Sequence, residues 1–216
     1  MYPFILHESL NTIIVALSDT TVGKVQLPRM GEWVNAKTGK PVDFLNKGGP
    51  TVENEVKALQ YANAINDLMP RFYHVEPWQM EDGATHDMIV MERIYPLPIH
   101  HFDLPVRIAM MATFEAKMKA LHDAWFVHGD FIRPAPYFDR NNKEWMFGNI
   151  VQTESGLRLI DAGFAQIGST KDIEKLRPII KIMVQEAAEV KYFREYYLGD
   201  NDSAAAGDGL EEGASL

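Results

Sequence analysis

Three short segments lie close together in this chain: Leu121-His-Asp-Ala-Trp-Phe-Val-His-Gly-Asp130, Gly148-Asn-Ile-Val151 and Leu157-Arg-Leu-Ile-Asp-Ala-Gly-Phe164. Each sets one polar side chain, Asp130, Asn149 or Asp161, beside a short apolar run. An amide and a carboxylate oxygen can hold Mg²⁺, and a second carboxylate can orient a hydroxyl group. The three segments together therefore predict a site for a metal-bound nucleotide.

The three segments resemble the catalytic and metal-binding loops of the protein-kinase-like superfamily. That family's pattern is His-x-Asp, a later Asn, and then Asp-x-Gly, and His128-Gly129-Asp130, Asn149 and Asp161-Ala162-Gly163 match it. The resemblance implies that Asp130 is the catalytic base and that His128 braces its loop. It also implies that Asn149 and Asp161 hold Mg²⁺ and that ATP is the second cofactor.

The distance between the first two motifs departs from the family pattern. Asp130 and Asn149 lie 149 − 130 = 19 residues apart, whereas the family usually has about five. The segment from Phe131 to Phe147 must therefore loop out and return, and it could form part of the acceptor-binding surface. It could equally supply Asn141 or Asn142 as the metal ligand. We prefer Asn149, because an apolar pair follows it directly, as the family pattern requires.

Upstream, the resemblance implies a strand lysine that faces the phosphates and is held by a helix glutamate. Lys24 is the only lysine within a β-rich run ahead of a helix. Glu55 is the expected partner, with Glu53 as second choice. Residues two apart on a helix do not share a face, so only one of the two should reach the lysine.

The remaining nucleotide contacts are expected at the junction between two lobes. Met91-Glu92-Arg93-Ile94 resembles the family's hinge, so Met91, Glu92 and Ile94 are the expected adenine-binding residues. The family's glycine-rich loop is missing, because only Gly23 precedes Lys24. Backbone N–H groups of residues 8–11 are the remaining candidates for holding the phosphates.

Hydrophobic periodicity and turn residues predict the elements around these motifs. Strands are expected at residues 12–17, 21–27, 71–75, 87–94, 149–152 and 157–161, with a turn at 81–84. Helices are expected from Thr51 to Pro70, over 106–124, and over about 171–197. In the second helix, the apolar face is expected to consist of Ile108, Met111, Phe114, Met118 and Leu121. Residues 31–50 read as a long loop, and the chain after Asp130 as irregular until Asn149.

This order of elements matches an α+β protein. The resemblance implies a two-lobed protein-kinase-like fold with a small β-rich N-lobe and a reduced helical C-lobe. The expected divisions are an N-lobe over 1–94, a C-lobe over 95–198 and a disordered acidic tail over 199–216.

Composition limits the partners. The formal charge is −9 and there is no cysteine, which argues against nucleic-acid binding and excludes disulfides, cysteine zinc sites and thiol nucleophiles. Neither a secretory signal nor a membrane span is read in the sequence. The expected location is the cytoplasm, and delivery of the protein into a host cell is the alternative. The expected partner is a protein substrate, with no nucleic acid and no membrane.

Three functions within the superfamily compete. Only 216 − 163 = 53 residues follow Gly163, too few for the large helical subdomain of aminoglycoside or choline kinases, although those enzymes often carry His-Gly-Asp. A pseudokinase that only binds partners fits the missing glycine loop, but the four intact residues Lys24, Asp130, Asn149 and Asp161 oppose it. The sequence therefore favours a minimal Ser/Thr protein kinase, similar to bacterial effector or phage-type kinases.

Overall fold

The computed structural model describes residues 3–8, 12–27, 51–99, 101–131, 137–139, 144–146, 148–170 and 173–199. Within these residues the protein is α+β, with a five-stranded antiparallel sheet and three α-helices. The expected loop at 31–50, most of the expected phosphate-binding segment at 8–11, the alternative ligands Asn141 and Asn142, and the expected tail beyond Gly199 lie outside the described residues.

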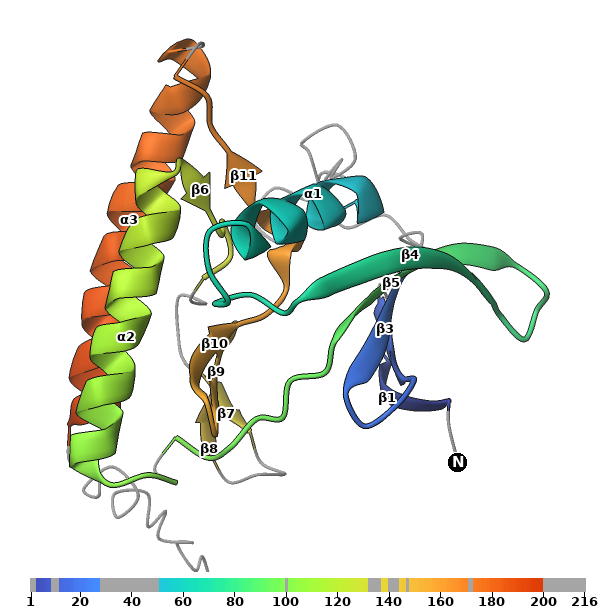
Figure 1. The fold of residues 1–216 in the computed structure, drawn as a ribbon, viewed down its shortest axis with the longest axis horizontal. Helices are drawn as coiled ribbons and strands as arrows, with labels where there is room; N and C mark the ends of the chain where they lie inside the picture. The colour runs from blue at the N-terminus through green and yellow to red at the C-terminus, as the bar shows by residue number, and fades with distance from the viewer. Residues whose placement is uncertain are drawn as a thin grey trace, which may run out of the picture.

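The five-stranded sheet has the strand order β1-β2-β3-β5-β4. Its strands are β1 (Phe4–Glu8), β2 (Thr12–Ala16), β3 (Thr21–Gln26), β4 (Phe72–Gln79) and β5 (Thr85–Glu92). The β4–β5 hairpin projects away from the rest of the molecule (Figure 1). The expected hairpin at 12–27 and the turn at 81–84 are confirmed, with Gly83 at a φ of +86°.

Three strands of this sheet differ from expectation. β5 was expected over 87–94 and lies two residues earlier, at Thr85–Glu92. β4 continues through Pro77 to Gln79, because an edge strand tolerates a residue without an N–H group. β1 was not predicted at all. Its five residues are all exposed, so the strand lacks the alternation of buried and exposed positions by which a strand is recognised in a sequence.

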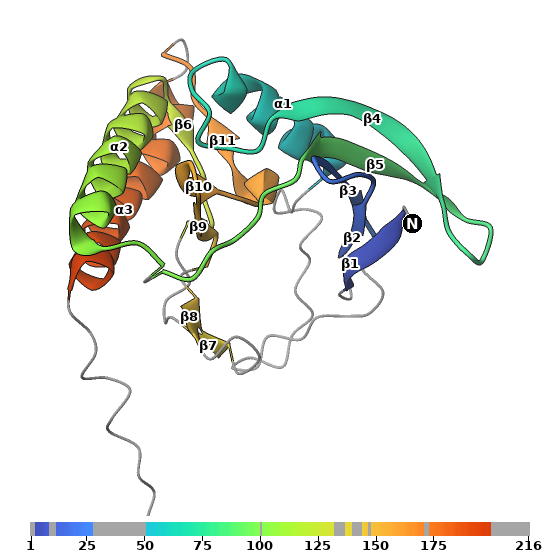
Figure 2. The ribbon, with the colours of Figure 1, turned by 60° about the horizontal axis from the view of Figure 1, so that its bottom comes forward.

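Helix α1 (Val52–Asn63) lies against β4 and β5 (Figure 2). Thr51 begins it as expected, because its side chain accepts a hydrogen bond from the backbone N–H of Asn54 at 3.1 Å. The helix ends at Asn63 and not at Pro70, so that prediction was wrong. The Asn63 side chain donates to the Pro70 carbonyl at 3.2 Å and accepts from the Phe72 N–H at 2.8 Å, and these bonds hold the chain where it turns back into β4.

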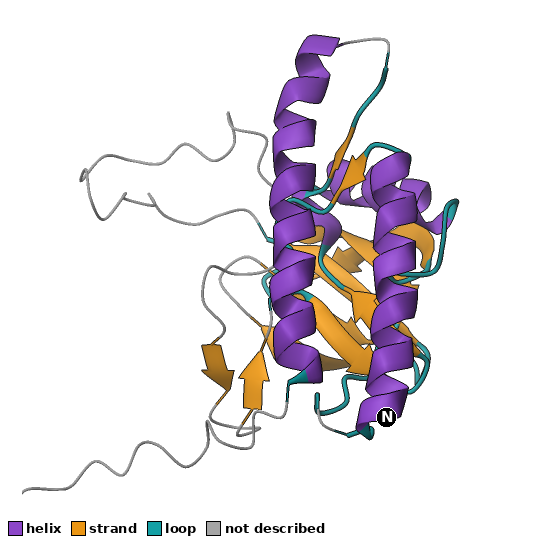
Figure 3. Ribbon diagram, turned by 90° about the vertical axis from the view of Figure 1, so that its left-hand side faces the viewer, coloured by secondary structure: helices purple, strands orange, loops and turns teal. Residues whose placement is uncertain are grey.

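The remaining elements form a second part of the molecule. Helices α2 (Leu104–Asp123) and α3 (Ile173–Leu198) run antiparallel, side by side along one flank (Figures 1 and 3). The short elements beside them are β6 (Phe126–Val127), β7 (Tyr137–Asp139), β8 (Glu144–Met146), β9 (Ile150–Thr153), β10 (Gly156–Leu159), the 3₁₀ turn η1 (Ala162–Phe164) and β11 (Gln166–Ile167). They pair as β6 with β11, β7 with β8, and β9 with β10.

Helix α2 begins two residues earlier than predicted. Asp103 accepts a hydrogen bond from the Val106 N–H at 3.3 Å, and Pro105 occupies the first turn, where its missing N–H costs nothing. Ile108 was expected in the core but is 48% exposed, whereas Arg107 is buried. The stretch expected to be irregular before Asn149 contains the β7–β8 hairpin.

One hydrophobic core runs through both parts of the molecule. It includes Val22 of β3, Leu59 of α1, Phe114 of α2, Leu159 of β10 and Phe193 of α3. A smaller cluster packs on the opposite face of the sheet. None of the helices within the described residues has the length and apolar character needed to cross a membrane.

Candidate functional site

The site is centred on a buried lysine. Lys24 lies in β3 with 6% of its surface exposed. Side chains alternate between the two faces of a strand, so Lys24 shares the face of Val22, which belongs to the main core, while Val25 packs into the cluster on the other face. The sheet therefore aims the ammonium group of Lys24 toward α1 and the second part of the molecule.

Two carboxylates meet that ammonium group. Lys24 Nζ lies 2.8 Å from Glu55 Oε1 and 2.7 Å from Asp161 Oδ1. Glu55, in α1, is 1% exposed and also accepts a hydrogen bond from Gln26 Nε2 at 2.6 Å. Glu53, the second choice, is exposed and pairs with Lys57 one helical turn away. The structure thus brings Lys24, Glu55 and Asp161 together from three separate elements.

The charges of this cluster stabilise one another. Burial by itself lowers the pKa of Lys24, but the carboxylates of Glu55 and Asp161 outweigh it and hold that pKa above its ordinary value. For Asp161, desolvation acts to raise the pKa, yet the Lys24 ammonium and the Gly163 N–H hold it below its ordinary value. At neutral pH Lys24 is therefore a cation and Asp161 an anion.

Asp161 is placed by the hairpin of β9 and β10. Ile150 pairs with Leu159, and one step further the Ile160 N–H donates to the Asn149 carbonyl at 2.9 Å. Asp161 follows directly with a left-handed φ of 60°, and 46% of its side chain is exposed. The antiparallel register therefore sets Asn149 beside the residue that precedes Asp161.

Asp130 reaches the same region through its own loop. The His128 ring is fully buried and its Nε2 donates to the Ile160 carbonyl at 2.9 Å, which ties the loop to the end of β10. The side-chain amide of Asn149 donates to the Asp130 carbonyl oxygen at 2.6 Å and lies 3.4 Å from Asp130 Oδ2. His128 and Asn149 are therefore both tied to Ile160, the residue before Asp161, and Asn149 is tied to Asp130.

A glutamate that the sequence reading missed supports this loop from behind. Glu186 of α3 is 1% exposed. Its Oε1 accepts from the Gly129 N–H at 2.7 Å, and its Oε2 lies 2.8 Å from His122 Nε2 of α2. A carboxylate on the buried face of a helix is the signal that could have found it, since such a group needs partners.

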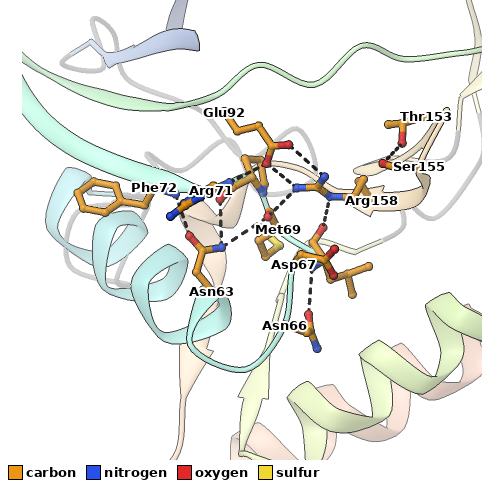
Figure 4. Close-up of polar contacts among 12 residues, drawn as sticks. Asn63, Asn66, Asp67, Met69, Arg71, Phe72, Glu92, Thr153, Ser155 and Arg158 are labelled. Atoms are coloured by element: carbon orange, nitrogen blue, oxygen red, sulfur yellow. Dashed lines mark hydrogen bonds and ion pairs between the residues drawn. The ribbon is translucent and has the colours of Figure 1, made fainter. Parts of the chain in front are cut away.

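The expected adenine-binding residues differ in burial and in their contacts. Met91 is buried and Ile94 is partly buried. The Glu92 carboxylate is occupied by Arg158 of β10, with Nη2 to Oε2 at 2.7 Å (Figure 4). The backbone N–H groups of Glu92 and Arg93 are occupied as well, because they donate to the Arg71 and Thr20 carbonyls at 2.8 and 2.9 Å. Arg158 was not predicted from the sequence.

Gly23, the one glycine before Lys24, has a packing role. A Cβ atom there would lie 2.1 Å from the Met88 sulfur of the neighbouring strand. No real Cβ contact is that short, so a side chain at this position would displace Met88. Packing against Met88 thus accounts for the glycine at position 23.

The donors left over suit a hard cation. Asp161 Oδ1 is taken by Lys24 and Gly163, and the Asn149 amide nitrogen by Asp130, so within the described residues Asn149 Oδ1 and Asp161 Oδ2 are the oxygens left to bind a metal. One amide and one carboxylate oxygen suit Mg²⁺ bound jointly with phosphates. Within the described residues no group of three or more His, Asp or Glu gathers as a metal site, and this pair contains a single carboxylate.

Comparison with known proteins does not place the chain in a family, because no family model matches it and no curated protein matches it in sequence. The functional assignment therefore depends on the residues of the site.

Proposed function

We propose that this protein is an ATP-dependent phosphotransferase, and most specifically a minimal Ser/Thr protein kinase. The observation that carries the proposal is the buried Lys24 between Glu55 and Asp161 at 2.8 and 2.7 Å. A lysine held by a helix glutamate next to a metal-binding aspartate is the arrangement with which kinases position nucleotide phosphates. The sheet with α1 and the part built on α2 and α3 would be the two lobes.

The proposed roles follow from the contacts. Lys24 binds phosphate oxygens as a point charge, and Glu55 keeps it in place. Asn149 and Asp161 would hold Mg²⁺, which neutralises charge on the phosphates when bound. Asp130 orients the acceptor hydroxyl and takes its proton. Lys24 contacts Asp161 through Oδ1, so Oδ2 would be the Asp161 oxygen that holds the metal.

A protein acceptor is favoured by the short chain between Asp161 and α3. Only 172 − 161 = 11 residues separate Asp161 from Ile173, where α3 begins. No helical subdomain that would enclose a small molecule can be built in that length. A hydroxyl presented on a protein surface needs no such subdomain.

The proposal is tested by incubating the protein with γ-labelled ATP and Mg²⁺, with a cell lysate or a panel of small-molecule acceptors. Asp130→Ala and Asp161→Ala should both abolish transfer while the far-UV circular dichroism stays unchanged. Asp123→Ala is the matched control, because Asp123 is an exposed carboxylate that, within the described residues, forms an ion pair only with Lys119 one turn away. It should transfer at the wild-type rate.

Each result has a clear meaning. Label on discrete proteins, lost in both site variants, supports a protein kinase. Label on small molecules alone moves the protein to the metabolite- or antibiotic-kinase class. Wild-type protein that neither transfers label nor binds ATP contradicts the proposal and leaves a binding module.

A further inference from the structure

Arg158 makes an unusual number of contacts for one buried side chain. It lies in β10, three residues before Asp161, and is 8% exposed. Its Nε donates to the Leu68 carbonyl at 3.3 Å, and its Nη2 to the Met69 carbonyl at 3.0 Å. Nη1 and Nη2 together form a bidentate pair with Glu92, at 3.2 and 2.7 Å (Figure 4).

These contacts join three segments that each lead to the candidate site. Leu68 and Met69 belong to the connection between α1, which carries Glu55, and β4. Glu92 ends β5, the strand paired with β3, which carries Lys24. Arg158 itself stands on the strand that leads to Asp161. The neighbouring Leu159 N–H donates to the Leu68 carbonyl at 2.9 Å, so backbone and side chain fasten the same junction.

Glu92 is in turn fixed from its other side. Its Oε2 accepts from the Arg71 N–H at 3.0 Å, and its own N–H donates to the Arg71 carbonyl at 2.8 Å. Burial acts to raise the pKa of Glu92, but Arg158 and the Arg71 N–H outweigh it and hold the pKa below its ordinary value. The carboxylate therefore stays charged at neutral pH, and the pair with Arg158 persists.

We infer that Arg158 is a positioning residue, which holds α1 and the end of β5 in register with Asp161 so that Glu55 and Lys24 meet the phosphates correctly. This inference rests on the proposed phosphotransferase function. Arg158 touches none of the reacting groups. It acts through the α1–β4 connection on Glu55 and through Glu92 on the end of β5, the segment expected from the sequence to bind adenine.

The two halves of the cluster should affect different kinetic constants. Arg158→Lys keeps a positive charge near Glu92 but cannot reproduce the planar fork that also reaches the two carbonyls. It should lower kcat roughly tenfold, because small displacements of catalytic groups are costly, and change the KM for ATP less than about threefold. Glu92→Gln loosens the segment expected to bind adenine and should mainly raise the KM for ATP, again by roughly tenfold.

The kinetics are measured with γ-labelled ATP, Mg²⁺ and the acceptor labelled in the experiment above. Arg194→Lys is the control, because Arg194 also pairs with a glutamate, its Nη1 donating to both carboxylate oxygens of Glu115 at 2.8 and 2.7 Å, but on the exposed outer side of α2 and α3. Ile179→Ala controls for stability, since Ile179 is a buried residue of α3 that makes none of the site's contacts. All rates are measured at a temperature at which every variant is folded, as shown by urea unfolding at the same temperature.

A kcat lost in Arg158→Lys and retained in both controls supports the positioning role. A kcat unchanged in Arg158→Lys, or equally low in Ile179→Ala, overturns it while leaving the phosphotransferase itself established by the active wild type. An inactive wild type overturns the proposed function, and this role with it.

Discussion

Replacing Lys24 by methionine tests the central cluster most directly. The substitution keeps the length and apolar stem of the side chain and removes only the ammonium group. Glu55, 1% exposed, then loses its cation and keeps only the hydrogen bond from Gln26 at 2.6 Å. Removing one partner from a buried ion pair costs about 3–5 kcal/mol.

The lower end of that range applies here. The Asp161 side chain is 46% exposed and can turn to water, so Glu55 is the one carboxylate left stranded. We therefore expect a loss of about 3 kcal/mol in the free energy of unfolding, which for a chain of this size lowers Tm by about 6–12 °C. Transfer of label from ATP should fall to background.

Urea unfolding at pH 7, followed by tryptophan fluorescence, measures the free energy. Lys57→Met is the control, because its pair with Glu53 is exposed on both sides, and it should leave stability unchanged. A loss below about 1 kcal/mol for Lys24→Met would contradict the reasoning, since an exposed pair gives that much.

The same variant should change how stability depends on pH. The folded pKa of Lys24 lies above its ordinary 10.5, so its contribution is fully present below that pH and is lost as pH rises through the folded pKa. The folded pKa of Asp161 lies below its ordinary 3.8, so its contribution is present above that pH and is lost as pH falls through the folded value. Wild type should lose stability at both ends, and Lys24→Met should lack the alkaline loss. Identical alkaline profiles would rule out the buried cation.

Two further substitutions test the loop that carries Asp130 and the contact between α3 and β9. Gly129→Ala should abolish transfer and lower the free energy of unfolding by at least about 2 kcal/mol, because Gly129 has a φ of +78° and a Cβ would lie 2.3 Å from the Phe164 carbonyl oxygen. Gly156→Ala is the control, since Gly156 has a φ of +128° but open space around it, and it should keep full transfer. Equal activity of the two variants would disprove the clash. Tyr197→Phe should lower the free energy of unfolding in urea by about 1–3 kcal/mol, because the buried hydroxyl donates to Gln152 Oε1 at 2.5 Å. Burial also raises the pKa of Tyr197 to about 12. An unchanged urea midpoint would mean that Gln152 finds another donor.

Local patterns predicted the parts of the structure that are fixed locally. The hairpin at 12–27, the cap at Thr51 and the β9–β10 hairpin all follow from short-range alternation and turn residues. The contact of Lys24 with Glu55 was anticipated from the resemblance to the protein-kinase-like superfamily, which implies a strand lysine held by a helix glutamate.

Residues that act across long sequence separations left no readable pattern. Arg158 and Glu92 stand 66 positions apart, and Glu186 and Gly129 stand 57 apart. Each looks like an ordinary charged residue of a strand or helix until tertiary packing buries it. Arg107, and not Ile108, lies on the buried face of α2 for a similar reason. Its guanidinium donates to the Tyr197 carbonyl at the end of α3.

The candidate site is built from both parts of the molecule, so its residues come together at different times during synthesis. During synthesis, the sheet and α1 can already oppose Lys24 and Glu55 once residue 92 has emerged. Asp161, 137 positions beyond Lys24, and the supporting Glu186 of α3 are added later. Because domains fold progressively as they emerge, we expect the nascent chain to carry the lysine–glutamate pair well before it carries a complete site. Nucleotide turnover would then begin only after α3 has packed beside α2.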